Sequence, residues 1–165
     1  MDLGRVARHV VQTRRGLRRA FPPATLDAIE RAVHEGEQSH LGEVRFAIEA
    51  ELGWPALWRG ATPRDRAVEV FAALGVWDTE SNGGVLIYVL MADHAVEIVA
   101  DRGVDRHVPA GEWAAICERM RGRFREGAFE AGALEGIVAV NALLRRHLPA
   151  GGPRPPGLPD RPAVL

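Results

Sequence analysis

The chain has 165 residues, a net charge of −1 and a single cysteine, which is typical of one soluble domain with a substantial core. The near-neutral charge gives no reason to expect a nucleic acid as partner, and one cysteine excludes an internal disulfide. All 21 basic residues are arginine, so chemistry that needs a lysine, such as a Schiff base, is excluded.

The first predicted element is an amphipathic, basic helix over residues 2–19. Leu3, Val6 and Val10 recur at helical spacing, and the arginines fall mostly on the other side. The two prolines at 22–23 end this helix. Its basic face is either solvated surface or a contact for an acidic partner or an anionic membrane surface. The arginines available for that contact are Arg5, Arg8, Arg15 and Arg19.

A second helix is predicted from Pro23 to just before Gly42, which suits its C-terminal end. Residues 43–52 then alternate, with Val44, Phe46 and Ile48 on one side. The other side of this strand carries Glu43, Arg45, Glu49 and Glu51. We therefore expect a half-buried strand with one polar face.

After a loop at 53–62 and a helix over 63–74, residues 84–91 are apolar throughout. A continuous apolar run bounded by turn residues predicts a strand buried on both faces. A turn at Asp93-His94 leads into a partner strand over 95–100, which is antiparallel. The helix between strands 43–52 and 84–91 makes those two strands a parallel pair with a right-handed crossover.

Two further helices are predicted over 110–125 and 128–147, after a loop at 101–109. The order ααβαββαα describes an α/β protein, a three-layer α/β/α sandwich with a small mixed sheet. From Pro149 onward the chain is rich in proline and glycine, and we expect a mobile or partner-dependent tail. The predicted organisation is a basic helix over 1–22, an α/β domain over 23–148 and a tail over 149–165.

Short polar side chains lie at the ends of the buried hairpin. Asp78 and Asn82 precede strand 84–91, and Asp101 ends its antiparallel neighbour, so these three can meet at one edge of the sheet. Carboxylate and amide oxygens suit a hard cation such as Ca²⁺ or Mg²⁺. Asp93 lies in the turn at the other end of the strand, about 25 Å away, and should not join them. The alternative is that the three residues cap turns and form a local ion pair.

Arg102 follows Asp101 and could bind a phosphate or carboxylate through its guanidinium. A metal-assisted phosphomonoesterase would use Asp78, Asp101 and Arg102. No serine or threonine has a neighbouring candidate base, and Cys117 lies on the apolar stripe of its helix, so it is expected in the core.

Several of these motifs occur together in one known family. Asn82-Gly83 precedes the apolar strand, an acidic turn follows it, and Val96-Glu97-Ile98 leads into an Asp/Gly loop. The pattern continues in Glu112-Trp113, Ile116-Cys117, Met120, Phe124-Arg125-Glu126-Gly127 and Phe129-Glu130-Ala131-Gly132. Across residues 24–148 the chain resembles the TPM domain, which is shared by a thylakoid lumen protein implicated in photosystem II repair and by bacterial proteins of unknown role.

The resemblance implies an acidic site with bound calcium at the Asp78, Asn82 and Asp101 end. Members of the family have been called phosphatases, metal binders and accessory factors. This chain has Asp101-Arg102-Gly103 where many members carry Gly-Tyr-Gly, and Asp93-His94 where Asp-Arg is more usual. These departures weaken the phosphatase interpretation.

The first functional hypothesis is an accessory or binding protein that acts through protein contacts, with a divalent cation as an optional structural element. The alternatives are the phosphatase and a module that self-associates through helix 2–19 and the tail. No apolar run is long enough for a signal peptide or a membrane span. Together with the single cysteine, this favours the cytoplasm, whereas the family's commoner form carries a signal peptide.

Overall fold

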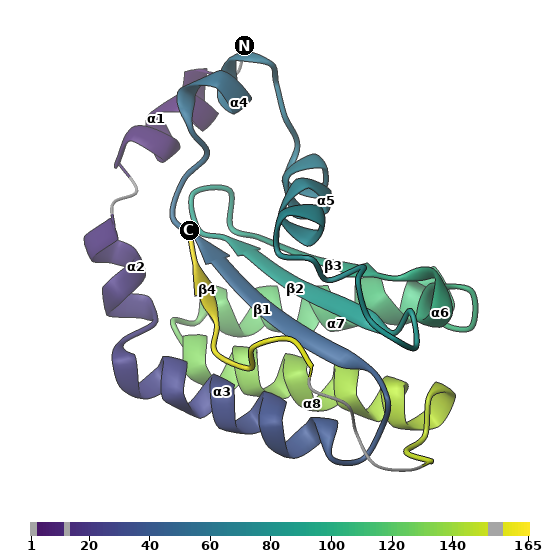
Figure 1. The fold of residues 1–165 in the computed structure, drawn as a ribbon. Helices are drawn as coiled ribbons and strands as arrows, with labels where there is room; N and C mark the ends of the chain where they lie inside the picture. The colour runs from purple at the N-terminus through teal and green to yellow at the C-terminus, as the bar shows by residue number, and fades with distance from the viewer. Residues whose placement is uncertain (1–2, 12–13, 152–156) are drawn as a thin grey trace.

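The computed structural model describes residues 3–11, 14–151 and 157–165 (Figure 1). The helices are α1 (Leu3–Val11), α2 (Arg14–Ala20), α3 (Pro23–Glu37), α4 (Trp54–Trp58), α5 (Pro63–Ala73), α6 (Arg102–Asp105), α7 (Ala110–Arg125) and α8 (Phe129–His147). The strands are β1 (Glu43–Glu49), β2 (Gly84–Leu90), β3 (Ala95–Ala100) and β4 (Ala163–Val164). The predicted α/β class and the longer helices are confirmed, while α4 and α6 are short helices inside segments predicted as loops.

The four strands form one mixed sheet in the order β3-β2-β1-β4. β1 pairs in parallel with β2 from Glu43 opposite Gly84 to Glu49 opposite Leu90. β2 pairs with β3 in the antiparallel direction, as predicted. Ile87, at the centre of β2, is fully buried, and all seven residues of this strand are buried. The continuous apolar run therefore marks the centre of the sheet.

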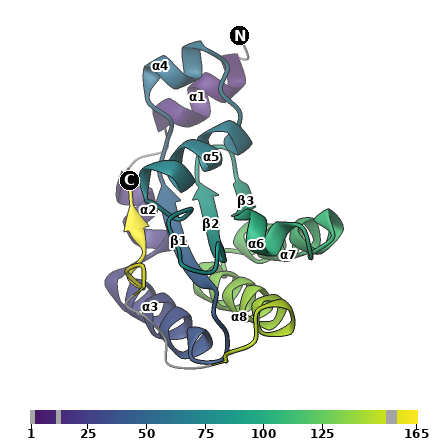
Figure 2. The same ribbon diagram turned by 45° about the vertical axis from the view of Figure 1, so that its right-hand side comes forward.

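Alternate residues of the sheet contribute to two separate cores. Phe46 and Ile87 belong to the larger core, which α3, α7 and α8 cover. Leu86 and Tyr88 point to the other face, where α5 packs and Leu158 of the C-terminal segment adds cover. This arrangement is the predicted three-layer sandwich, with helices on both faces of the sheet (Figures 1 and 2).

The prediction of a polar, solvent-facing side for β1 is wrong, because all seven of its residues are buried. Residues 157–165 run across its polar side, and their backbone forms hydrogen bonds with Glu43 and Arg45. Arg45 donates to the carbonyl oxygens of Pro159 and Arg161. The Glu43 carboxylate accepts a hydrogen bond from the backbone N–H of Leu158 at 2.6 Å.

The C-terminal segment is thus an ordered part of the fold, and its predicted mobility is wrong for residues 157–165. β4 extends the sheet beside β1, and the backbone N–H of Leu165 donates to the carbonyl of Ile48 at 2.9 Å. Arg161 also forms ion pairs with Asp27 and Glu30 of α3. Backbone pairing stabilises a segment whose few apolar side chains do not predict order. Residues 152–156 of the predicted tail lie outside the described residues.

The single basic helix predicted over 2–19 is two helices, α1 and α2, joined through residues 12–13, which lie outside the described residues. Leu17 of α2 is buried against the main core. α1 lies apart from it, beside α4 and at one end of the sheet (Figure 2). The N-terminal arginines are therefore spread over two helices with different surroundings.

Candidate functional site

The predicted polar cluster lies at the edge of the sheet where β2 begins. The backbone N–H of Gly103 donates to the carbonyl of Asn82 at 2.9 Å, and that of Asp101 donates to the carbonyl of Gly84 at 2.8 Å. Asn82 has a left-handed backbone with φ of 48°, which suits asparagine in a tight turn. The structure therefore brings Asn82 together with the segment from Asp101 to Gly103.

Gly103 allows this close approach of two loops. A Cβ atom at Gly103 would lie 2.4 Å from the carbonyl oxygen of Asn82 and 2.6 Å from that of Ser81. Neither backbone atom can move aside easily, so a larger residue would separate the loops. The glycine that follows Asp101-Arg102 is thus the sequence signal for this contact.

Asp101 and Arg102 make specific local contacts in this cluster. One carboxylate oxygen of Asp101, Oδ1, accepts from the backbone N–H of Arg102 at 2.7 Å and caps α6. Its other oxygen, Oδ2, is buried and has no hydrogen-bond partner among the described residues. Arg102 Nη2 donates to the Asn82 side-chain oxygen at 3.0 Å. Asp101 Oδ2 is thus a buried acceptor without a partner among the described residues, whereas the side-chain oxygen of Asn82 already accepts from the guanidinium of Arg102.

Asp78 lies on the exposed surface of the loop that precedes β2, and its backbone N–H donates to the carbonyl of Gly75 at 2.9 Å. Across the described ranges no group of three or more histidine, cysteine, aspartate or glutamate side chains is placed to hold a metal ion. A cation at this edge would therefore need the Asn82 oxygen or backbone carbonyls besides the two aspartates.

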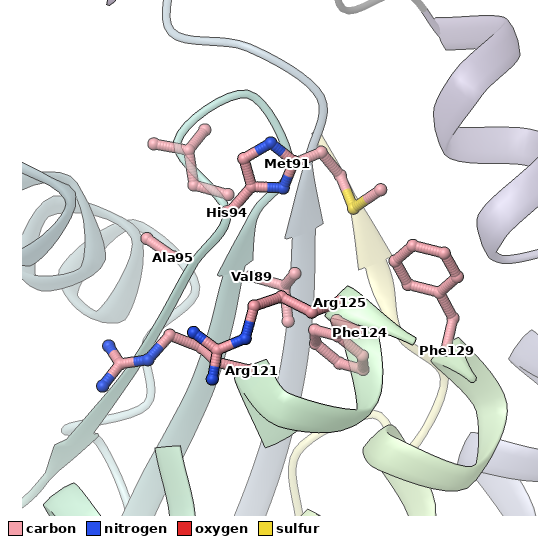
Figure 3. Close-up of a pocket in the computed structure, with 9 residues that line it drawn as sticks. Val89, Met91, His94, Ala95, Arg121, Phe124, Arg125 and Phe129 are labelled. Carbon is pink, nitrogen blue, oxygen red and sulfur yellow. The ribbon is translucent and has the colours of Figure 1, made fainter. Parts of the chain in front are cut away.

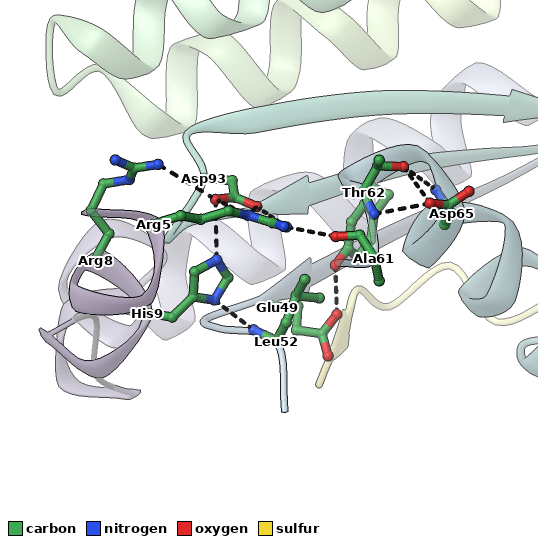
Figure 4. A network of polar contacts seen from close by, with 10 residues as sticks. Arg5, Arg8, His9, Glu49, Leu52, Ala61, Thr62, Asp65 and Asp93 are labelled. Atoms are coloured by element: carbon green, nitrogen blue, oxygen red, sulfur yellow. Dashed lines mark hydrogen bonds and ion pairs between the residues drawn. The ribbon is translucent and has the colours of Figure 1, made fainter. Parts of the chain in front are cut away.

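A second polar network, not predicted from the sequence, joins α1 to the turn between β2 and β3 (Figure 4). Arg5 donates to both oxygens of Asp93, with Nη2 at 2.7 Å from Oδ2, and also to the carbonyl of Ala61. His9 is buried and places Nε2 at 3.1 Å from Asp93 Oδ1. Asp93 therefore serves as the anchor of α1, at the opposite end of β2 from Asp101.

The hydrogen bonds of His9 define its tautomer. Its Nδ1 accepts from the backbone N–H of Leu52 at 3.0 Å, so the ring proton is on Nε2, which donates to Asp93. Burial by itself would raise the pKa of Asp93, but the hydrogen bonds from Arg5 and His9 and the positive charge of Arg5 outweigh it and lower that pKa. The only sequence signal for this network is the spacing of Arg5 and His9, four residues apart on one helix.

Glu49 and Cys117 are two further chemically active residues, and both are buried inside the fold. Glu49 accepts two hydrogen bonds from Arg66, each at 2.9 Å, and one from the Tyr88 hydroxyl at 2.5 Å. Burial and the Glu49 carboxylate raise the pKa of Tyr88, so the hydroxyl stays protonated. Burial raises the pKa of Cys117 to about 11, so this residue is a neutral thiol in the core rather than a nucleophile.

The exposed aromatic residues mark a third feature. Trp54 and Trp58 are 60% and 72% exposed and lie four residues apart on α4, so they share one face of that helix. Trp77 is 55% exposed but lies at the other end of the sheet, next to Val76, whose carbonyl touches Gly84 at the start of β2. Sequence reasoning placed Trp54 and Trp58 in a loop and did not find their shared face.

The fold is an α/β domain with helices on both faces of its sheet and a polar cluster at each end of β2. Residues 17–143 match the family model of the TPM domain, which is more than half of the chain. The chain therefore belongs to the TPM domain family, as its motifs predicted. The comparison with curated proteins found no match.

Solved structures share this fold. The BA42 protein of the psychrophilic bacterium Bizionia argentinensis, determined by NMR, is 26% identical, with a TM-score of 0.75 over 86% of this chain and 93% of that one. The N-terminal domain of a protein from P. gingivalis is 23% identical, with a TM-score of 0.62 over 76% of this chain and 77% of that one. Among the helices of the described residues, none is long and apolar enough to cross a bilayer.

Proposed function

We propose that this TPM-domain chain is a binding protein that acts through contacts with an acidic protein partner, made by the face of α4 and the neighbouring α1. The observation that carries the proposal is the exposed pair Trp54 and Trp58. Tryptophan and arginine are enriched among the residues that dominate the energetics of protein interfaces, and tryptophan buries a large area at a small cost in side-chain freedom. Two such rings on one helix face are a ready anchor for a partner.

Charge supports an acidic partner. The described parts of α1 and α2 carry several arginines and no acidic residue. Arg8 is 49% exposed, and Arg15 and Arg19 of α2 are exposed as well. Arg5, the fourth arginine expected in this contact, is instead held by Asp93 and serves the fold. The proposed contact therefore rests on Arg8 of α1 and the two tryptophans of α4, and the exposed Arg15 and Arg19 of α2 add positive charge outside it.

The test is partner capture by the tagged full-length chain in its native cells, with chemical cross-linking and mass spectrometry. The variant is Trp54→Ser/Trp58→Ser, and the matched control is Trp77→Ser, which removes an equally exposed tryptophan at the other end of the sheet. We expect an acidic protein to be enriched by the wild type and by Trp77→Ser, and to be lost with the double variant. Equal capture by all three chains would contradict the proposal.

A lipid surface is the competing occupant, because tryptophan and arginine also favour bilayer interfaces. Flotation with phosphatidylserine vesicles separates the two. Binding of the wild type to these vesicles, together with its loss in Trp54→Ser/Trp58→Ser, would replace the acidic protein by a membrane. The absence of flotation, together with specific protein capture, supports the proposal as stated.

A divalent cation at Asp78, Asn82 and Asp101 is a second candidate function, and the buried, unpartnered Oδ2 of Asp101 favours it. Ca²⁺ fits better than Mg²⁺, because it tolerates irregular sets of carboxylate and carbonyl oxygens. Calorimetry with each ion on the wild type and on Asp101→Asn tests this candidate. A heat of binding that the substitution abolishes supports the site, whereas no heat, or equal heat in both proteins, rules it out.

The phosphatase alternative would add Arg102 to the same residues. Phosphoryl transfer needs a positioned nucleophile as well as a clamp, and catalysis depends on that preorganisation. Arg102 donates to Asn82 at 3.0 Å, and Cys117 is a neutral thiol in the core. The binding protein is therefore the better supported function.

A further inference from the structure

A hollow with an apolar floor opens where β2 ends, beside the turn that α1 anchors (Figure 3). Val89 and Met91 line it from the sheet, and Phe124 and Phe129 line it from α7 and α8. The two phenyl rings stack with their centroids 5.4 Å apart, and Phe21 packs against both at 6.0 and 5.6 Å. Ring packing of this kind makes the floor rigid before any ligand arrives.

The rim of the same hollow is cationic. Arg121 and Arg125 line it from α7, and His94 lines it from the β2–β3 turn. Both guanidiniums pair with one carboxylate, because Arg121 reaches Glu118 Oε2 at 2.7 Å and Arg125 reaches Glu118 Oε1 at 2.8 Å. Two positive charges thus share one negative charge, which leaves one uncompensated positive charge before His94 is counted.

The turn that carries His94 is held in a defined shape. His94 has a left-handed backbone with φ of 51°, and its N–H donates to the carbonyl of Met91 at 3.1 Å. The preceding residue, Asp93, is bonded to Arg5 and His9 of α1. The wall of the hollow is therefore positioned by α1, and the site is largely preformed.

The location of the hollow suits a ligand. The hollow lies at the carboxyl ends of the parallel strands β1 and β2, which is where open α/β sheets bind ligands. The hollow is shallow and partly open to solvent, so a ligand would lie along its surface and remain partly exposed. It lies at the opposite end of β2 from Asp101, so it is separate from the candidate cation site.

We propose that this hollow binds a small amphipathic carboxylate, with the apolar body on the phenylalanine floor and the carboxylate on Arg121 and Arg125. A guanidinium pairs with a carboxylate through two parallel hydrogen bonds. The single uncompensated charge matches a monoanion better than a phosphate, which carries about −1.5 to −2 at neutral pH. This site goes beyond the proposed protein contact, which uses α4 and the exposed arginines.

The test is an NMR titration of the ¹⁵N-labelled full-length chain with octanoate. Octanol has the same apolar body without the charge, and acetate has the charge without the body. We expect saturable shifts with octanoate at the amides of the β2–β3 turn and the end of α7. Octanol and acetate should each bind at least about tenfold more weakly than octanoate, because octanol lacks the carboxylate and acetate lacks the apolar chain.

The variant Arg121→Gln/Arg125→Gln should weaken octanoate binding about tenfold, the loss expected for a charge-assisted pair. The matched control, Arg119→Gln/Arg145→Gln, removes two exposed arginines outside the hollow and should leave the affinity within twofold. All four side chains lie on the surface, so both variants should fold. Octanoate shifts at other amides, octanol binding as tightly as octanoate, or equal losses in the two variants would overturn the proposal.

Discussion

Replacing Asp93 with asparagine should release α1 from the end of the sheet while the rest of the domain stays folded. In the wild type this carboxylate accepts from Arg5 and His9, and its side chain is only 7% exposed. Asparagine keeps the shape and one acceptor oxygen but loses the charge. Arg5 would keep the carbonyl of Ala61 but lose its ionic partner, so the polar attachment of α1 would be weakened.

The size of this loss in stability depends on how deeply the Arg5–Asp93 ion pair is buried. Removing one partner of a fully buried ion pair costs about 3–5 kcal/mol, and an exposed pair is worth about 0.2–1 kcal/mol. The Arg5 side chain is 21% exposed, which places this pair between the two limits. We expect the free energy of local opening of α1 to fall by about 2–3 kcal/mol, which is a change of about 30- to 150-fold in the opening equilibrium.

The backbone amide of Leu52 is a direct probe of this opening, because its hydrogen-bond acceptor is the ring of His9. Native-state hydrogen exchange should show Leu52 exchanging about 30- to 150-fold faster in Asp93→Asn. The amide of Asp101, which donates to Gly84 at the far end of the sheet, should be unchanged. Glu126→Gln removes a carboxylate that is 67% exposed and serves as the matched control. Unchanged exchange at Leu52 would refute the anchoring role of Asp93.

The stability that Asp93 contributes should also depend on pH, in a direction that its pKa shift sets. Because the folded-state pKa of Asp93 is lowered, its contribution to stability is complete above the unfolded value of about 3.9. That contribution is lost as the pH falls through the lower folded value, since the folded state must then take up a proton. The difference in urea midpoint between the wild type and Asp93→Asn should therefore shrink below about pH 3.9. A constant difference down to pH 2 would contradict this assignment.

Three further predictions concern the core, the C-terminal segment and catalysis. Truncating the fully buried Ile87 to alanine should cost about 2–5 kcal/mol, and an unchanged denaturant midpoint would contradict its central position. Deleting residues 157–165 should cost about 1–3 kcal/mol in urea unfolding, because Arg45 loses its carbonyl partners; an unaltered midpoint would show that this segment does not stabilise β1. The purified chain should show no turnover of an aryl phosphate with Ca²⁺, Mg²⁺ or Mn²⁺ at pH 4–8, and turnover that disappears in both Asp78→Ala and Asp101→Ala would restore the phosphatase alternative.

The elements that the sequence predicted correctly are those whose signal is local. A seven-residue apolar run bounded by turn residues predicted the buried strand β2, and helical spacing of apolar residues identified α3, α5, α7 and α8. The approach of Asn82 to Asp101 was also predictable, because antiparallel strands joined by a short turn bring their outer ends to one edge. The sequence also determined the family, since its motifs lie within one continuous stretch.

Tertiary structure decided the features that depend on residues far apart in the chain. Glu43 and Arg45 alternate with apolar residues, which is the pattern of a strand with one solvent-exposed face. That face is buried only because residues 157–165 return across β1. In the sequence, Asp93 looks like an ordinary turn residue. In the fold, α1 places Arg5, more than eighty positions earlier in the chain, against it. The cationic hollow likewise combines the β2–β3 turn with α7 and α8. For Glu43, Arg45 and Asp93 the partner that satisfies the charge is absent from the local sequence, so the burial of these residues could be learned only from the folded chain.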